Sequence, residues 1–245
     1  MNAYEHLASV YDLFMGEIPY ESWAKHINVI LKNFVPNCNL VLDLGCGTGN
    51  ITTLLKDFGY EMIGVDISED MLAVAKEKSK DILYLNQDMC DFELYGTVDA
   101  CICVCDSVNY ILEETELTQM LALVKNYLNP NGLFIFDINT EYKYQHILGD
   151  NNFSRVEEDT AYIWENFYDD EQKINEYYAN IFVKNDSNNY TRYEEFHYQK
   201  AYSVEALKGF IENIGLKLLH IYDGFTFDLP QEKSERLVFV VQKGD

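Results

Sequence analysis

The sequence predicts an α/β fold with a seven-stranded mixed β-sheet, and three observations support this prediction. Strand-like and helical segments alternate through the middle of the chain, which is typical of parallel strands joined by right-handed helical crossovers. A run of aromatic, alternating segments follows this part. A helix and two further strand-like segments end the sequence. With 245 residues, the chain is long enough to bury a sizeable core.

The alternating part predicts five strands with helices between them. We expect the strands at residues 40–45, 61–66, 82–88, 98–106 and 133–139, and the helices at residues 48–59, 68–79 and 114–128. Ser68 is a suitable N-cap for the second of these helices. The fourth strand, VDACICVCD, is apolar on both faces, as a central strand of a parallel sheet should be.

The pattern changes after the fifth strand. Residues 160–168, 173–183 and 190–198 alternate or cluster aromatic and β-branched residues, and turn-like stretches separate them. This pattern predicts an antiparallel β insertion. After the insertion we expect a helix that begins at Ser203 and ends near Gly215, and then two last strands at residues 216–225 and 235–243.

Composition limits the classes of partner. The chain has 18 Lys and Arg residues against 41 Asp and Glu residues, a formal net charge of -23. Nucleic acids are held mainly through phosphate contacts from Lys and Arg, so this balance disfavours a nucleic-acid partner. No run approaches the roughly 18 apolar residues of a membrane span, and the N-terminus does not read as a secretory signal. We therefore expect a cytoplasmic protein without membrane contact, and its oligomeric state is left open.

Six cysteines could indicate a metal site or could simply fill the core. They are Cys38, Cys46, Cys90, Cys101, Cys103 and Cys105. Three of them share one face of the strand CICVC, but neither a second cysteine pair nor a nearby histidine completes a tetrahedral set. Cysteine often serves as a small buried hydrophobe. Core packing is thus favoured and no metal is predicted.

The stretch VLDLGCGTGN, residues 41–50, is the strongest motif in the chain. A strand here leads through three alternating glycines into a helix. Glycine adopts positive φ freely and lets a ligand approach the backbone, and a helix start offers unpaired N–H groups. The dinucleotide fingerprint G-x-G-x-x-G would need its third glycine where Asn50 stands. The observed order is instead Asp43, Gly45, Gly47 and Gly49, each two residues apart.

In this spacing the sequence resembles the class I S-adenosylmethionine-dependent methyltransferases, whose first motif is an acidic residue followed by G-x-G-x-G. The resemblance covers about residues 38–140 and is greatest to small bacterial-type enzymes of unassigned substrate, and looser to glycine/sarcosine N-methyltransferases. It implies a Rossmann-like fold and S-adenosyl-L-methionine as the cofactor. On this basis we interpret residues 1–245 as a single methyltransferase domain. Its expected parts are an N-terminal helical lid (1–36), a cofactor-binding core (37–140), an antiparallel insertion (141–202) and a C-terminal helix with two strands (203–245).

The resemblance also implies roles for particular residues. Asp66 ends the second strand where the family places an acidic residue that binds the ribose hydroxyls. Asp88 and Met89 stand at the adenine-contact position, and Met71 matches an apolar residue that packs on the adenine. The full set predicted to contact the cofactor is Tyr11, Tyr20, Trp23, Asp43, Gly45, Cys46, Gly47, Gly49, Asp66, Ile67, Met71, Asp88, Met89 and Cys105.

Three regions could form the site of the methyl acceptor. The N-terminal segment carries a Tyr11-Asp12 pair that resembles the lid of related enzymes, although its aromatic residues could equally pack on the core. After the fourth strand, Asp106, Asn109 and Tyr110 are predicted for methyl transfer, and Asp106 could alternatively cap a turn. In the aromatic insertion, His197 and Tyr198 are candidate acid–base groups, although tyrosines on strands more often pack within a sheet.

The predicted function is transfer of a methyl group to an N, O or C nucleophile of a small molecule by direct in-line displacement. Such an enzyme aligns the nucleophile and excludes water, and it needs a base only for a protonated acceptor. The alternatives are a non-catalytic S-adenosylmethionine-binding or sensor protein and an RNA methyltransferase. An NAD-dependent oxidoreductase is disfavoured by Asn50.

Overall fold

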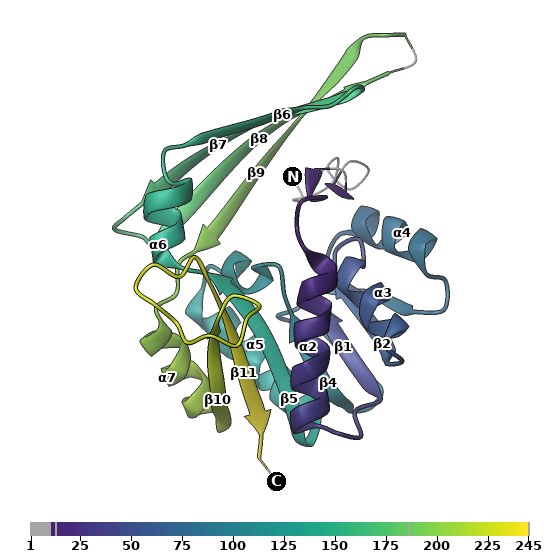
Figure 1. Cartoon of the computed structure of the whole chain (residues 1–245), viewed down its shortest axis with the longest axis vertical. Coiled ribbons are helices and arrows are strands. Elements are labelled where there is room, and N and C mark those ends of the chain that lie inside the picture. Colours follow the sequence, from purple (N-terminus) through teal and green to yellow (C-terminus); the bar gives the residue numbers. More distant parts are fainter. Residues whose placement is uncertain (1–10, 13, 186, 245) are drawn as a thin grey trace.

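The computed structural model describes residues 11–12, 14–185 and 187–244 and places a seven-stranded sheet at the centre of the molecule (Figure 1). Its strand order is β10-β11-β5-β4-β1-β2-β3. The strands from β5 to β3 in this order are parallel to one another, while β11 runs antiparallel to both of its neighbours. The prediction of an α/β fold with a mixed seven-stranded sheet is confirmed.

The elements of this sheet and its helices follow the predicted order. The strands are β1 (Leu40–Leu44), β2 (Glu61–Asp66), β3 (Leu83–Asn86), β4 (Val98–Cys103), β5 (Leu128–Asn139), β10 (Leu216–Asp223) and β11 (Arg236–Lys243). The helices are α2 (Tyr20–Phe34), α3 (Asn50–Asp57), α4 (Glu69–Lys78), α5 (Glu114–Tyr127) and α7 (Val204–Ile214), with short turns at η1 (Ser107–Tyr110), α6 (Glu141–Lys143) and η2 (Tyr144–Leu148). None of the helices described is both long and apolar enough to cross a membrane.

Helices cover both faces of the seven-stranded sheet. On one face, α2, α3 and α4 bury residues such as Ile27, Leu55 and Leu72 against the sheet. On the other face, α5 and α7 bury residues such as Leu121 and Ile211. Each of these helices places its apolar residues on one stripe, so the sheet is enclosed as the central layer of three.

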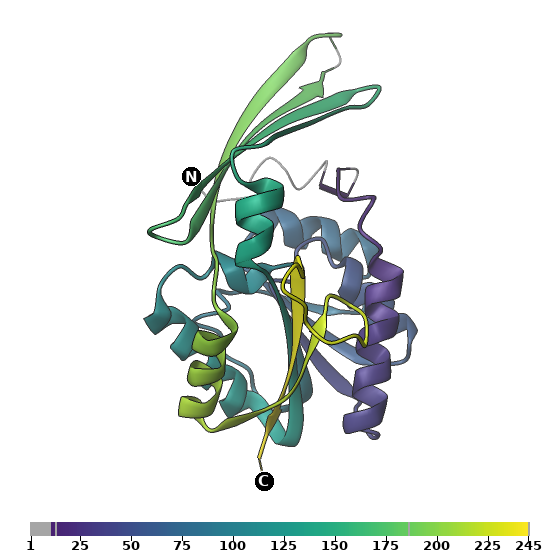
Figure 2. The same cartoon turned by 60° about the vertical axis from the view of Figure 1, so that its left-hand side comes forward.

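The insertion forms a second, four-stranded antiparallel sheet. Its strands are β6 (Asn152–Val156), β7 (Thr160–Asp169), β8 (Ile174–Lys184) and β9 (Tyr190–Lys200), in that order. Figures 1 and 2 show this sheet extending beyond one end of the seven-stranded sheet. Side chains in the second half of β9 alternate: Glu195, His197 and Gln199 are buried, whereas Phe196 and Tyr198 are exposed. One face of the small sheet is therefore turned inward and the other toward solvent.

Several boundaries differ from the prediction for physical reasons. Strand β6 was missed because nearly all its residues are exposed, which leaves no alternation to detect. Strand β4 stops at Cys103, and two left-handed residues follow it. Strand β5 begins at Leu128 rather than at the predicted residue 133, and its pairing with β4 shifts register there. The predicted N-terminal helical lid is described only in part, since residues 1–10 and 13 lie outside the described residues.

Asn109, which was predicted for methyl transfer, connects the two sheets instead of facing a cavity. Its Nδ2 donates to the carbonyl oxygens of Asn139 (3.2 Å) and Lys200 (2.8 Å). Its Oδ1 accepts from the backbone nitrogen of Asn139 at 2.9 Å. The side chain is fully buried, at 0% exposure. These bonds join the ends of β5 and β9 through η1.

Replacing Asn109 should therefore reduce stability. In Asn109→Ala, buried backbone groups of β5 and β9 lose their partners, and the free energy of unfolding should fall by about 2–4 kcal/mol. Denaturant titration measures this change. Asn33→Ala, on the exposed side of α2, is the matched control and should change stability by less than about 0.5 kcal/mol. Equal losses in both variants would contradict the assignment.

Candidate active site

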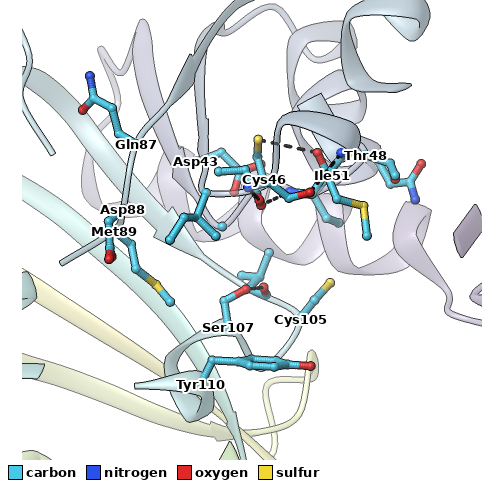
Figure 3. Close-up of a pocket in the computed structure, with 18 of the residues that line it drawn as sticks. Asp43, Cys46, Thr48, Ile51, Gln87, Asp88, Met89, Cys105, Ser107 and Tyr110 are labelled. Atoms are coloured by element: carbon cyan, nitrogen blue, oxygen red, sulfur yellow. Dashed lines mark hydrogen bonds between the residues drawn. The ribbon is translucent and has the colours of Figure 1, made fainter. Parts of the chain in front are cut away.

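A cavity of about 390 Å³ lies at the carboxyl ends of the parallel strands. Ligands of open α/β sheets bind at this edge, and ligand pockets span about 300–1,000 Å³. In Figure 3 the turn around Cys46, the Asp88–Met89 segment and the Cys105–Tyr110 segment surround the cavity on different sides. These segments follow β1, β3 and β4 respectively. We refer to this space as the first cavity.

The glycine turn leaves its backbone open to the first cavity. Gly45, Gly47 and Gly49 have φ values of +68°, +53° and +75°, a region that glycine enters without steric cost. A Cβ on Gly45 would lie 2.8 Å from the Oγ of Ser107, so the turn packs closely there. A Cβ on Gly47 would meet nothing within 4 Å. The glycine turn thus packs closely against Ser107 at Gly45 and leaves space for a ligand beside the backbone of Gly47.

Asp66, the last residue of β2, is fixed between the glycine turn and the start of α4. Its Oδ2 accepts from the backbone nitrogen of Gly47 at 2.7 Å, and its Oδ1 accepts from that of Ser68 at 2.9 Å. Burial raises the pKa of this carboxyl group, while the backbone donors oppose the rise. Asp66 lines the first cavity, so its remaining acceptor capacity can serve a ligand.

Asp43 lies beneath the same turn and is almost completely buried. Its Oδ2 accepts from the Oγ1 of Thr52 at 2.6 Å. Burial raises the pKa of Asp43 to about 7, the hydroxyl of Thr52 opposes this rise, and the nearby carboxyl of Asp66 adds to it. The group consequently titrates near neutral pH.

The first cavity is acidic. Its wall carries the carboxyl groups of Asp43, Asp66, Asp88 and Glu116, and no lysine or arginine of the described residues lines it. Such a wall suits a cationic ligand and repels an anionic one such as a pyrophosphate.

The N-terminal segment is attached to the start of α3. The Oδ1 of Asp12 accepts from Thr48 Oγ1 (2.7 Å) and Asn50 Nδ2 (2.9 Å). Its Oδ2 forms an ion pair with Lys78 at 2.5 Å. Asn50, the residue that breaks the dinucleotide fingerprint, therefore binds this segment. Tyr11, beside Asp12, lines the first cavity as a result.

A second cavity of about 150 Å³ lies between the N-terminal segment and the inner face of the four-stranded sheet. Its wall consists of Tyr11, Phe14, Met15, Cys105, Asp106, Tyr110, Tyr162, Trp164, Tyr177, Ala179, Ile181, His197 and Gln199. Tyr11, Cys105 and Tyr110 line both cavities, so the two spaces share a wall.

A polar network holds Asp106 at the edge of the second cavity. Gln199 donates from Nε2 to Asp106 Oδ2 at 2.7 Å, and its Oε1 accepts from the hydroxyls of Tyr144 and Tyr177. Arg236 donates to Asp106 Oδ1 at 2.7 Å. On β9, two positions before Gln199, the Nε2 of His197 lies 3.0 Å from Oε2 of the buried Glu195. Asp106 is therefore held at both of its carboxylate oxygens.

The backbone at the shared wall is strained. Cys105 and Asp106 have φ values of +62° and +54°, and a non-glycine residue in this region costs on the order of 1–3 kcal/mol. Burial raises the pKa of the Cys105 thiol well above its usual value, so it stays protonated and is a poor nucleophile. Cys101 and Cys103 are buried in the core, in line with the packing role predicted for them. Among the residues described, no group of His, Cys, Asp and Glu side chains is arranged to hold a metal ion.

Most residues predicted to contact the cofactor meet at the first cavity. These are Tyr11, Tyr20, Asp43, Gly45, Cys46, Gly47, Asp66, Ile67, Met71, Asp88, Met89 and Cys105. Gly49 and Trp23 do not line it. Gly49 is the N-cap of α3, and a Cβ there would lie 2.8 Å from the hydroxyl of Tyr84. The ring of Trp23 stacks on Phe225 with centroids 4.2 Å apart.

The residues predicted for methyl transfer are divided between different places. Asp106 lines the second cavity and Tyr110 lines both, whereas Asn109 lines neither. Sequence reasoning missed Gln199 and Arg236, because each lies on a strand far along the chain from Asp106. No local motif marks either residue; only the alternation on β9 predicts that Gln199 faces inward.

Comparisons with known proteins identify the family. Residues 41–132 match the model of a methyltransferase domain. A protein of Geobacillus sp. (strain WCH70), named as a methyltransferase, is 35% identical over 98% of this chain and 99% of its own length. The crystal structure of an S-adenosylmethionine-dependent methyltransferase from Clostridium acetobutylicum ATCC 824 superposes with a TM-score of 0.88 at 31% identity over 100% of both chains.

A third relative matches a shorter part. The dTDP-3-amino-3,4,6-trideoxy-α-D-glucopyranose N,N-dimethyltransferase of Streptomyces venezuelae is 32% identical over 53% of this chain and 56% of its own length. The fold, the acidic first cavity and the full-length relatives together show that this chain belongs to the class I S-adenosylmethionine-dependent methyltransferases. It is an enzyme of that class, and its cofactor is S-adenosyl-L-methionine.

The residues present fit this cofactor. The backbone of Gly47 faces open space where a ligand can approach it. Asp66 offers acceptors for hydroxyl groups, and the acidic wall suits a ligand that carries ammonium and sulfonium charges. The Rossmann-like arrangement and the cofactor that the motif implied are thus confirmed.

Removal of the Asp66 carboxylate should weaken cofactor binding. Asp66→Ala should cost about 1.5–3 kcal/mol of binding free energy, which is the scale of hydrogen bonds to a charged group. Isothermal titration calorimetry with S-adenosylmethionine and S-adenosylhomocysteine measures the change. Asp70→Ala, on the exposed side of α4, should bind as the wild type does. Unchanged affinity in Asp66→Ala would mean that this carboxylate does not contact the cofactor.

Asp43 should make the stability of the free protein depend on pH. Its pKa of about 7 lies above the ordinary value of 3.8 for an aspartate, so between these two pH values the folded state binds more protons than the unfolded chain. Stability then falls as pH rises through this window, by up to about 1.4 kcal/mol per pH unit.

The side chain of the Asp43→Asn variant cannot ionise, so its stability does not fall with rising pH for this reason. Its free energy of unfolding relative to the wild type should increase from pH 5 to pH 7, as measured by urea titration at each pH. Asp70→Asn is the control and should keep a constant difference. A constant difference for Asp43→Asn would show that Asp43 does not titrate in this range.

Proposed function

We propose that this enzyme transfers the methyl group of S-adenosylmethionine to an amine nitrogen of a small molecule bound in the second cavity. The observation that carries the proposal is Asp106, a carboxylate held among aromatic side chains at the edge of that cavity. The second cavity shares a wall with the first, so an acceptor there would lie next to the cofactor.

In this proposal the first cavity binds the donor. The glycine turn and Asp43 hold its methionine part, Asp66 binds the ribose hydroxyls, and the Asp88–Met89 segment with Met71 binds the adenine. When bound, the cofactor supplies an electrophilic methyl carbon. The protein contributes alignment and exclusion of water, because an in-line displacement requires no covalent help from the chain.

The second cavity favours an amine over an anionic acceptor. Its wall includes the rings of Tyr110, Tyr162, Trp164 and Tyr177, and aromatic faces attract a cationic or partly positive amine. No lysine or arginine of the described residues lines this cavity. The amine reacts in its neutral form: Asp106 accepts an N–H hydrogen bond from it and so orients its lone pair toward the shared wall, and the ammonium product releases its proton to solvent.

The comparisons agree with an amine acceptor. The Streptomyces venezuelae relative is named for N,N-dimethylation of an amino sugar nucleotide, and it matches about half of this chain. Its name supports the type of nucleophile rather than the identity of the acceptor. The net charge of -23 disfavours RNA, since long-range repulsion would oppose a polyanion.

Matched acceptors test the proposal. We expect turnover with small primary amines such as cyclohexylamine and none with the corresponding alcohol, cyclohexanol, when S-adenosylhomocysteine formation is followed. Asp106→Asn should lower kcat/KM for the amine by roughly 10- to 100-fold, the scale of one charge-assisted hydrogen bond, with cofactor affinity within about threefold of the wild type. Asp70→Asn is the matched control.

Two outcomes would contradict the proposal. Preferential methylation of hydroxyl or carboxylate acceptors would exclude the amine assignment. Cofactor binding without turnover across amines, phenols and carboxylates would favour a sensor role instead.

A further inference from the structure

Arg236 occupies an unusual position for an arginine. It is the first residue of β11, and only 15% of its side chain is exposed. Its guanidinium donates to Oδ1 of Asp106 at 2.7 Å and to Oδ2 of Asp137. The guanidinium carbon also lies over the ring of Trp23 on α2, 5.1 Å from its centroid. One side chain thus joins β11, β5, α2 and the segment after β4.

The contacts of Arg236 hold the strained pair Cys105–Asp106 at two points. The backbone nitrogen of Asp106 donates to Oδ2 of Asp137 at 3.1 Å, the same oxygen that Arg236 contacts. The side chain of Asp106 is held by Arg236 directly. A left-handed conformation at two successive non-glycine residues persists only where surrounding contacts impose it. Asp137 supplies such a contact to the backbone of Asp106, and Arg236 supplies one to its side chain.

Arg236 also balances two carboxylates that would otherwise repel each other. Asp137 is completely buried and Asp106 is 21% exposed at its side chain. A buried charge that loses its partner carries a large desolvation cost. Removal of the guanidinium would therefore leave Asp137 buried without its charge partner, and Asp106 could then rotate about the contact that Gln199 makes with its Oδ2.

We infer that Arg236 is a positioning residue for methyl transfer. By fixing the carboxylate of Asp106 and the left-handed turn of Cys105, it sets the shared wall between the two cavities and so the alignment of the acceptor. Trp23 completes this arrangement by covering the guanidinium from α2. This role rests on the proposed function, because it requires the acceptor to bind in the second cavity.

Two substitutions test the role of Arg236. Arg236→Met removes the charge and both hydrogen bonds, and kcat for cyclohexylamine should fall by about 100-fold, as a small misplacement of a reacting group can cause. Arg236→Lys keeps the charge but cannot donate to two carboxylates as a planar fork, so it should restore kcat to within about tenfold of the wild type. Cofactor affinity, measured by calorimetry, should stay within about threefold in both variants.

A binding measurement independent of turnover uses the two tryptophans of the chain. Trp164 lines the second cavity, so the change in tryptophan fluorescence on titration with cyclohexylamine reports on binding there, and Trp23 is kept in every variant because it packs against Arg236. Amine affinity should fall in Arg236→Met and recover partly in Arg236→Lys. Arg192→Lys is the matched control: Arg192 is half exposed on β9, where it contacts Glu194 and Asn180, and its replacement should change none of these quantities.

The outcomes separate this inference from the proposed function. If the wild type neither binds nor methylates amines, the proposed function fails and the inference fails with it. If the wild type methylates amines and Arg236→Met keeps its kcat and amine affinity, only the positioning role is overturned. A purely structural role would lower thermal stability in both variants without rescue of kcat by lysine. Should Arg236→Met not fold, Asp137→Asn takes its place, because Asp137 Oδ2 contacts both Arg236 and the backbone nitrogen of Asp106, and wild-type kcat and amine affinity in Asp137→Asn would overturn the inference.

Discussion

The hydrogen bond from the backbone nitrogen of Gly47 to the carboxylate of Asp66 is the contact on which the site depends, at 2.7 Å. It joins the turn after β1 to the end of β2, which the parallel register brings to the same edge of the sheet. Glycine is needed in the turn because its backbone is left-handed and faces open space. The carboxylate in turn fixes the start of α4 through Ser68. The first cavity is the space that these connections leave.

The wall of the second cavity, in contrast, is held by ion pairs and hydrogen bonds between buried side chains. There, Arg236 lies between two carboxylates, and Gln199 reaches the same Asp106 from the four-stranded sheet. Each donor and acceptor comes from a different element, so the network forms only when the whole chain has folded. The first cavity is built mostly from short local segments, whereas the second is built from contacts between distant ones.

This difference explains how far the sequence alone could lead. The succession of strands and helices along the chain could be predicted from alternation, although their order within the sheet was not. The glycine turn and most of the residues predicted for the first cavity could be found because Asp43 to Gly49 and Asp88 to Met89 are contiguous motifs at strand ends. Trp23 was expected at the cofactor because it is aromatic and lies near Tyr20. In the structure it packs instead on Phe225, which lies about two hundred positions further along the chain. Only the tertiary structure reveals this contact. Arg236 stood in a strand with no motif, so nothing local indicated its partners.

The alternation of side chains on β7 to β9 has a consequence for how this enzyme can change over evolution. Inner-face residues such as Trp164 and Tyr177 line the second cavity, and none of the strand residues of this sheet lines the first. With the acceptor in the second cavity, as we propose, substitutions on that face alter which molecule is accepted while the donor motifs stay intact. Selection can act on acceptor choice and on donor binding almost separately, so related chains can keep one methyl donor and diverge in what they methylate.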